Sequence, residues 1–162
     1  MFEICRNPGA RLVGMLLAVS LCSAAVRAQE GADSGATDPD IFYLQENAKR
    51  EGIIVRPSGL QIRIITRGTG DLPELTSTVV VHYEGRLVDG TIFDSSYERG
   101  KPTNFGIDDV IKGWTEALIL MQVGSIWEIS IPASIAYGDE GAGDAIPPGA
   151  TLIFKVELLA IS

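Results

Sequence analysis

The sequence predicts an α+β fold, in which one substantial α-helix covers a face of an antiparallel β-sheet and a short helix precedes the sheet. Several segments between residues 60 and 158 alternate apolar with polar side chains, the pattern of half-buried strands. One segment, residues 110–121, instead carries apolar side chains at helical spacing. With 162 residues and 46% hydrophobic composition, the chain is long enough to bury one such core.

Residues 1–28 are predicted to be a cleavable secretory signal peptide. Two arginines precede the apolar stretch 12–22, and Val26–Ala28 forms the small-x-small pattern of a cleavage site. One alternative is that the segment stays attached as a membrane anchor. Another is that Cys22 carries a lipid, although Leu21 stands where a lipobox has a small residue. No apolar run reaches the ~18 residues of a transmembrane helix, so we expect a periplasmic or secreted protein without a transmembrane anchor.

Residues 29–56 are predicted to form a linker and a short helix. The linker, residues 29–39, is rich in Gly, Ala, Asp and Ser. Over residues 40–51, Ile41, Leu44 and Ala48 recur at helical spacing, and Gly52 ends the pattern. Both cysteines lie before residue 29, so the mature chain is expected to fold without disulfides.

Four strands follow from the alternation of apolar residues. These residues are Leu60, Ile62 and Ile64; Val79, Val81 and Tyr83; Trp127, Ile129 and Ile131; and Leu152, Phe154, Val156 and Leu158. Asp89-Gly90 is a hairpin signal, and residues 137–148 form a loop punctuated by Gly and Pro.

The helical segment follows two acidic residues that favour a helix N-terminus, Asp108 and Asp109. Gly124 lies beyond its expected end. The residues at helical spacing are Val110, Ile111, Trp114, Ala117, Leu118 and Met121.

Composition and motifs argue against several kinds of chemistry. The net charge is −8, and no basic stripe suggests nucleic-acid binding. The phosphate-binding glycine motifs are missing. His82 is the only histidine, and it alternates out of phase with Tyr83, so it should face away from the side that Tyr83 lines. The acidic pairs 108–109 and 139–140 lack the alternating oxygen ligands of a calcium loop, so no metal site is predicted.

Five aromatic residues from separate segments remain, and they suggest either a plain core or a ligand pocket. Asp94 follows one of them directly, and a carboxylate beside buried rings needs hydrogen-bond partners, for which Arg99 and the tyrosine hydroxyls are candidates. An apolar concavity with a few placed polar groups is the usual form of a ligand pocket. The residues alone leave both interpretations open. The five are Tyr83, Phe93, Trp114, Tyr137 and Phe154.

Four separated motifs resemble those of the FK506-binding-protein (FKBP) type peptidyl-prolyl isomerases. Residues 81–96 (VHYEGRLVDGTIFDSS) resemble the family signature, and 110–114 (VIKGW), 136–138 (AYG) and 146–154 (IPPGATLIF) resemble its later motifs in the same order. The resemblance runs from Pro57 to Ser162, which implies an isomerase domain over 57–162.

Residues 46–52 and 57–61 resemble exported bacterial members related to macrophage infectivity potentiator. Those members often carry a long helical dimerisation arm. Here the arm is missing or vestigial, so we expect a monomer or a weak dimer.

The resemblance implies a twisted antiparallel sheet wrapped around one short helix, and a prolyl pocket with Trp114 as its floor. It assigns substrate carbonyls to the Tyr137 hydroxyl and the Ile111 N–H. Thr103, Ala142 and Ala145 differ from the best-known small members at the rim. The implied catalytic residues are Tyr83, Phe93, Asp94, Tyr137 and Phe154, and the implied substrate-binding residues are Arg99, Val110, Ile111 and Trp114.

The implied activity is peptidyl-prolyl cis-trans isomerisation without a cofactor during folding of exported proteins. The implied ligands are proline-containing polypeptides and FK506-like macrolides. A catalytically weak chaperone or binding module on the same fold is the alternative, and an unrelated β-rich ligand carrier is a third hypothesis.

Overall fold

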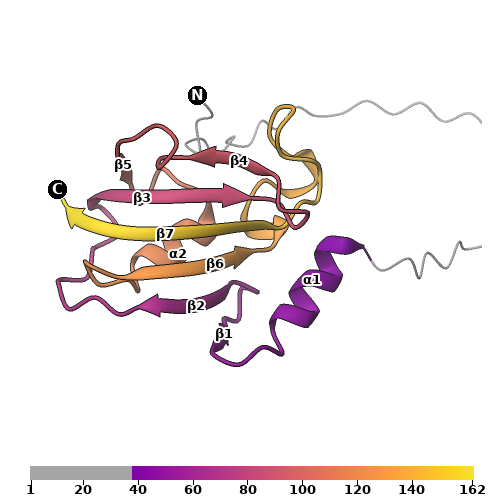
Figure 1. Cartoon of the computed structure of the whole chain (residues 1–162), viewed down its shortest axis with the longest axis horizontal. Helices are drawn as coiled ribbons and strands as arrows, with labels where there is room; N and C mark the ends of the chain where they lie inside the picture. Colours follow the sequence, from indigo (N-terminus) through magenta and orange to yellow (C-terminus); the bar gives the residue numbers. More distant parts are fainter. Residues whose placement is uncertain (1–37) are drawn as a thin grey trace, which may run out of the picture.

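The computed structural model describes residues 38–162, so the predicted signal peptide and most of the linker lie outside the described residues (Figure 1). No helix in this part of the chain has the length and apolar character needed to span a membrane. The elements are α1 (Pro39–Asn47), β1 (Ile53–Val55), β2 (Gln61–Thr66), β3 (Thr78–Arg86), β4 (Ile92–Ser95), β5 (Thr103–Gly106), α2 (Lys112–Leu118), β6 (Ile126–Ile131), the 3-10 turns η1 (Ala133–Ile135) and η2 (Gly138–Glu140), and β7 (Leu152–Ile161).

The strands form one antiparallel sheet in the order β1-β2-β6-β7-β3-β4, and β5 also pairs with β3. The central pair β3–β7 is the longest, with Tyr83 opposite Val156. Helix α2 lies behind the sheet in the view of Figure 1, and α1 lies at one end of it. The predicted α+β arrangement is therefore confirmed.

Alternation predicts the long strands correctly. Along β3 every second residue is buried, so Tyr83 faces the core while His82 faces away, as predicted. The hairpin at Asp89-Gly90 joins β3 to β4, and Gly90 has a φ of +91°, which favours glycine. Strands β1, β4 and β5 have only 3–4 residues, too few for a periodic signal. Strand β1 also extends the sheet upstream of Pro57.

Helix α2 is shorter than the predicted segment 110–121. It begins at Lys112, because Asp108 and Asp109 form a turn in which the Asp109 N–H donates to the Gly106 carbonyl at 3.1 Å. The expected inner face is nevertheless buried. Gly113 lets the helix approach the sheet, since a Cβ there would lie 2.4 Å from Cγ2 of Ile131.

The apolar stripe predicted for the first helix is wrong, and so is its end at residue 51. Helix α1 ends at Asn47, Ile41 is 53% exposed, and Ala48 is exposed as well. The helix docks through polar side chains instead. The Tyr43 hydroxyl lies 3.1 Å from Ser130 Oγ, and Asn47 Nδ2 donates to Gln61 Oε1 at 2.8 Å. Because these contacts are hydrogen bonds, hydrophobic spacing does not reveal the docked face.

Candidate functional site

Trp114 lies at the centre of an aromatic cluster that joins four segments of the chain. Its ring centroid lies 5.4 Å from Tyr83 on β3, 5.5 Å from Phe105 on β5 and 5.2 Å from Phe154 on β7. All three contacts are edge-on, a favourable arrangement for aromatic rings. Trp114 is fully buried. The sheet and α2 thus bring Tyr83 and Phe154, two of the predicted aromatic residues, against the ring of a third, Trp114.

Phe93 extends this cluster toward the surface. Its ring stands edge-on to Phe154 at 5.5 Å, and it is only half-buried. Gly85 makes room for both rings, since a Cβ at this position would lie 2.6 Å from the Phe154 ring and 2.7 Å from the Phe93 ring. Because Gly85 has no side chain, the rings of Phe93 on β4 and Phe154 on β7 can both pack against this point of β3.

A polar cluster borders the rings. The Tyr83 hydroxyl donates to Asp94 Oδ2 at 2.6 Å, and Arg99 Nη2 donates to that hydroxyl oxygen at 2.9 Å. Arg99 Nη1 also donates to Asp94 Oδ1. The Asp94 side chain is 6% exposed and that of Arg99 is 32% exposed. The predicted association of these three residues is confirmed, and Thr103 accepts a further bond from Arg99 at 3.3 Å.

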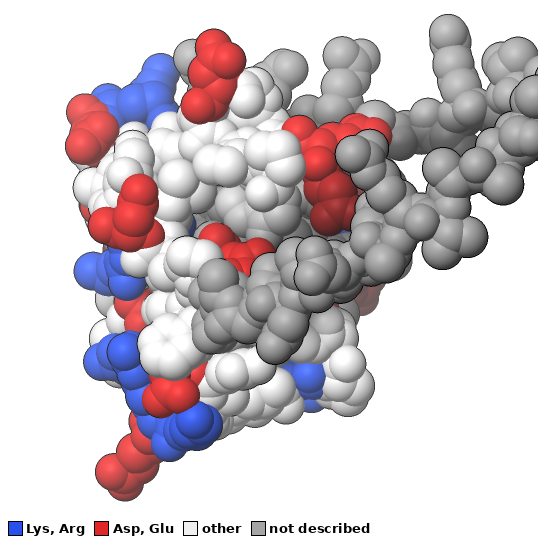
Figure 2. Space-filling view, turned by 90° about the vertical axis from the view of Figure 1, so that its right-hand side faces the viewer, with Lys and Arg blue, Asp and Glu red and all other residues white. Residues whose placement is uncertain are grey.

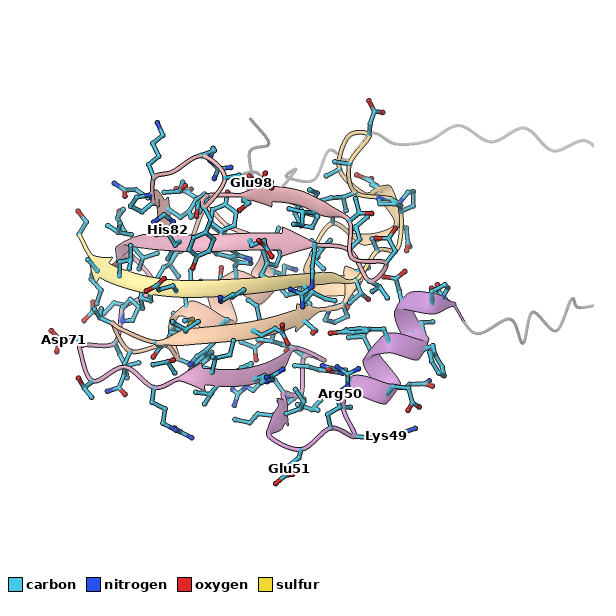
Figure 3. All side chains as sticks on the ribbon, viewed as in Figure 1. Lys49, Arg50, Glu51, Asp71, His82 and Glu98 are labelled. Atoms are coloured by element: carbon cyan, nitrogen blue, oxygen red, sulfur yellow. The ribbon has the colours of Figure 1, made fainter. Side chains whose placement is uncertain are left out.

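Ser96 fixes the main chain of Tyr83. The Tyr83 N–H donates to Ser96 Oγ at 2.7 Å, and the Ser96 N–H donates to the Tyr83 carbonyl at 2.9 Å. On the outer face of β3, His82 (Figure 3) lies with Nδ1 2.9 Å from Ser96 Oγ and stacks on Tyr97 at 4.7 Å. Fully buried Ser96 thus ties the strand that carries Tyr83 to the turn between Asp94 and Arg99.

The tyrosines of these two faces should make the protein less stable at alkaline pH. Burial, then the bond to Asp94, raises the pKa of Tyr83, and burial, then the bond to Glu157, raises the pKa of Tyr97 to about 12. The unfolded chain, with tyrosine pKa near 10, loses these protons first. The stabilisation that these two protonated tyrosines contribute should be fully present below about pH 10 and be lost as the pH rises further.

Urea unfolding midpoints between pH 8 and pH 11 measure this fall. In Tyr97→Phe the fall above pH 10 should be shallower, because one proton difference is removed. Equal slopes in the two proteins would show that Tyr97 is not protected from ionisation.

The remaining predicted residues lie around the same cluster. Val110 and Ile111 directly precede α2 and are buried in the same core as Trp114. Tyr137 follows η1 and packs, half-buried, against that core. The N–H of Ile111, the N-cap residue of α2, donates no hydrogen bond to any atom of residues 38–162. Trp114 Nε1 is buried without a hydrogen-bond partner in the same range.

Sequence reasoning missed Phe105, Gly85 and Ser96. Phe105 was detectable from its alternation with Ile107, but β5 is too short to stand out as a strand. The roles of Gly85 and Ser96 depend on contacts between strands, which spacing along one strand does not reveal. Among the described residues, no three His, Cys, Asp or Glu side chains gather into a candidate metal site.

Residues 70–159 match the sequence model of the FKBP-type peptidyl-prolyl cis-trans isomerases. The chain is 57% identical over 121 residues to the FKBP-type 22 kDa peptidyl-prolyl cis-trans isomerase of Escherichia coli, covering 75% of this chain and 59% of that protein. It is 50% identical over 119 residues to the outer membrane protein MIP of Legionella longbeachae, covering 74% of this chain and 51% of that protein. The chain therefore spans between half and three-fifths of these relatives.

A solved structure agrees with the sequence matches. The crystal structure of a peptidyl-prolyl cis-trans isomerase from Pseudomonas syringae superposes with a TM-score of 0.73 and 40% sequence identity. The superposition covers 78% of this chain and 93% of that one.

Proposed function

The chain belongs to the FKBP-type peptidyl-prolyl cis-trans isomerases, and from this premise we propose that it accelerates rotation about Xaa–Pro bonds in exported polypeptides. The observation that carries the proposal is the set of three rings edge-on to Trp114 beside the Tyr83–Asp94–Arg99 cluster. This arrangement offers an apolar floor and walls for a proline ring, with hydrogen-bonding groups at one border.

Rotation about an Xaa–Pro bond makes or breaks no covalent bond, so the site needs no nucleophile. Amide resonance sets a barrier of roughly 18–20 kcal/mol. The twisted amide has lost that resonance, and its carbonyl oxygen carries less negative charge than in the planar form. An apolar surround therefore costs the planar ground state more free energy than the transition state. About 4 kcal/mol of such differential stabilisation corresponds to roughly a thousandfold in rate.

In this proposal the proline ring rests on Trp114, between Phe93, Tyr83 and Phe154. Val110 and Ile111 close the side toward α2. The ring contacts support the assignment, because they gather apolar side chains from separate strands at one point, and a proline ring bound there is removed from water.

Two groups are proposed to hold the substrate main chain. The Ile111 N–H donates to a substrate carbonyl, and its lack of any acceptor among residues 38–162 supports this role. The Tyr137 hydroxyl donates to a second carbonyl. Asp94 and Arg99 keep the Tyr83 hydroxyl directed across the site. Fixing the carbonyl on one side of the rotating bond lets the other side turn.

A proline-limited refolding reaction and a protease-coupled Leu-Pro peptide assay test the proposal. We expect both to be accelerated, and Tyr137→Phe to slow the peptide reaction about tenfold, since one hydrogen bond to the substrate is lost. A protein that protects the client from aggregation but leaves the slow refolding phase unchanged would instead be the catalytically weak chaperone. FK506-like macrolides, the second proposed ligand class, should compete with the peptide.

We also propose that the protein acts outside the cytoplasm, as a monomer or weak dimer. The basic-apolar-small pattern of residues 1–28 supports export, and one relative is named an outer membrane protein. N-terminal sequencing of protein recovered from the periplasm should begin at Gln29. A chain that starts at Met1, or a lipid on Cys22, would contradict cleavage after Ala28.

A further inference from the structure

A hollow of about 290 Å³ lies outside the aromatic cluster. It is bounded by the first turn of α1, the β3–β4 connection and the segment before β7. These elements meet on the side of the molecule shown in Figure 2, where basic side chains lie mainly along one edge and the lower part. The lining residues are Pro39, Asp40, Leu87, Val88, Asp89, Pro147, Pro148 and Ala150.

The walls combine apolar surface with two carboxylates. Each carboxylate also has a local role, since Asp40 accepts the Thr151 N–H and Asp89 accepts the Thr91 N–H. The backbone bond from Thr91 is the main cause of a lowered pKa of Asp89, which is therefore ionised at neutral pH. Neither carboxylate takes part in an ion pair with Lys, Arg or His within residues 38–162.

We propose that this hollow binds a lysine or arginine side chain of the same polypeptide whose proline occupies the aromatic site. The long apolar stem of such a side chain fits against proline and leucine surface, while its cationic head reaches Asp40 and Asp89. A small inorganic cation would leave the apolar walls unused. The inference rests on the proposed function.

Chain connectivity explains why the occupant is part of the client. Residues 87–89 connect β3 to β4, the strands that carry Tyr83 and Phe93. Residues 147–150 run from the Tyr137 loop into β7, which carries Phe154, and the Gly149 N–H donates to the Gly138 carbonyl at 2.9 Å. The hollow is therefore lined by connections to the strands that carry the proposed prolyl site. Leu87 is four residues from Tyr83, at most ~14 Å along the strand, so we expect a bound extended chain to reach it.

The test uses Leu-Pro peptides in which lysine is placed at successive positions two to six residues from proline, on either side. Norleucine at the same position is the matched peptide, since it keeps the apolar stem and lacks the charge. At one or two positions we expect lysine to raise kcat/KM about three- to fivefold at low ionic strength, the size of a partly exposed ion pair. The advantage should vanish near 0.5 M salt, where the Debye length is only about 4 Å.

The double variant Asp40→Asn/Asp89→Asn should abolish the lysine advantage and leave the norleucine peptides unchanged. The amide oxygens still accept the bonds from Thr151 and Thr91, so folding is preserved. Asp139→Asn/Glu140→Gln removes the same charge from the neighbouring exposed loop, outside the hollow. An equal loss in this control would mean general attraction by an acidic surface and would overturn the inference.

Equal rates with lysine and norleucine at every position, while Leu-Pro is isomerised, would overturn the inference and leave the proposed function intact. If no peptide is isomerised, the proposed function fails. NMR titration with Nα-acetyl-lysine N-methylamide then tests the hollow by itself. Amide shifts at residues 87–89 and 150 that are lost in Asp40→Asn/Asp89→Asn support binding there, and their absence overturns it.

Discussion

Replacing Phe93 with alanine is expected to lower kcat/KM for a Leu-Pro peptide by roughly 30- to 100-fold, about 2–3 kcal/mol of transition-state stabilisation. The ring contacts Phe154 edge-on at 5.5 Å and is only half-buried, so part of its apolar surface stays exposed, and we propose that a substrate covers it. Removing it takes away an apolar wall and admits water, which stabilises the planar amide.

The same substitution should lower the free energy of unfolding by only about 1–2 kcal/mol, because a half-buried ring leaves a smaller cavity than the 3–5 kcal/mol typical of buried phenylalanine. Peptide assays on the folded fraction and urea unfolding separate the two effects. Ile92→Ala is the matched control, since Ile92 is the neighbour on β4 and is 45% exposed. This variant should change neither kcat/KM nor the free energy of unfolding by much. Wild-type rates in folded Phe93→Ala would remove this residue from the site.

The central strands of the sheet were predictable because buried apolar residues alternate with more exposed polar ones along each of them. Strand β3 alternates without a break, and its partner β7 buries Leu152, Phe154, Val156 and Leu158 as predicted. The burial of a continuous apolar face fixes the register, since a shift of one residue would turn every side chain to the wrong side. Strands β1, β4 and β5 are too short to show a repeating apolar pattern, so the sequence does not predict their register.

The first helix shows where this reasoning stops. Hydrophobic spacing selects Ile41 and Ala48, whereas the structure buries Asn47 against Gln61 and leaves Ile41 exposed. A buried amide pair contributes through its satisfied hydrogen bonds rather than through transfer of apolar area. Asn47 and Gln61 are 14 residues apart along the chain, so the sequence around either one does not predict that the two side chains pair.

Candidate site residues were found partly from the residues and partly from resemblance. The adjacency of Asp94 to Phe93 pointed to a buried carboxylate that needs partners, and Tyr83 and Arg99 are those partners. Which aromatic rings touch could not be derived, because Trp114 meets rings from three different strands. The catalytic role of each residue stays a prediction until the variants are measured.

Replacing Arg99 with methionine is expected to lower the free energy of unfolding by about 3 kcal/mol, more than an exposed ion pair contributes. The two partners differ in exposure: the Asp94 side chain is 6% exposed and that of Arg99 is 32% exposed. Without Arg99, the carboxylate stays buried with only the Tyr83 hydroxyl as a donor among its present partners. Without the carboxylate, the arginine can turn toward water.

Asp94→Asn should therefore cost only about 1 kcal/mol in the wild-type background. In the Arg99→Met background it should have the opposite sign and restore about 2 kcal/mol. The asparagine oxygen still accepts the Tyr83 hydroxyl, and the unpaired buried charge is gone. A double-mutant cycle by urea unfolding measures this change of sign.

The cycle also separates stability from activity. The double variant should be nearly as stable as the wild type and still slower with a Leu-Pro peptide, because the charged donor that holds the Tyr83 hydroxyl on its second side is missing. Additive effects in the cycle would mean that Arg99 acts as an ordinary surface charge. A stable double variant with wild-type activity would show that the charges of the cluster serve the fold and not the reaction.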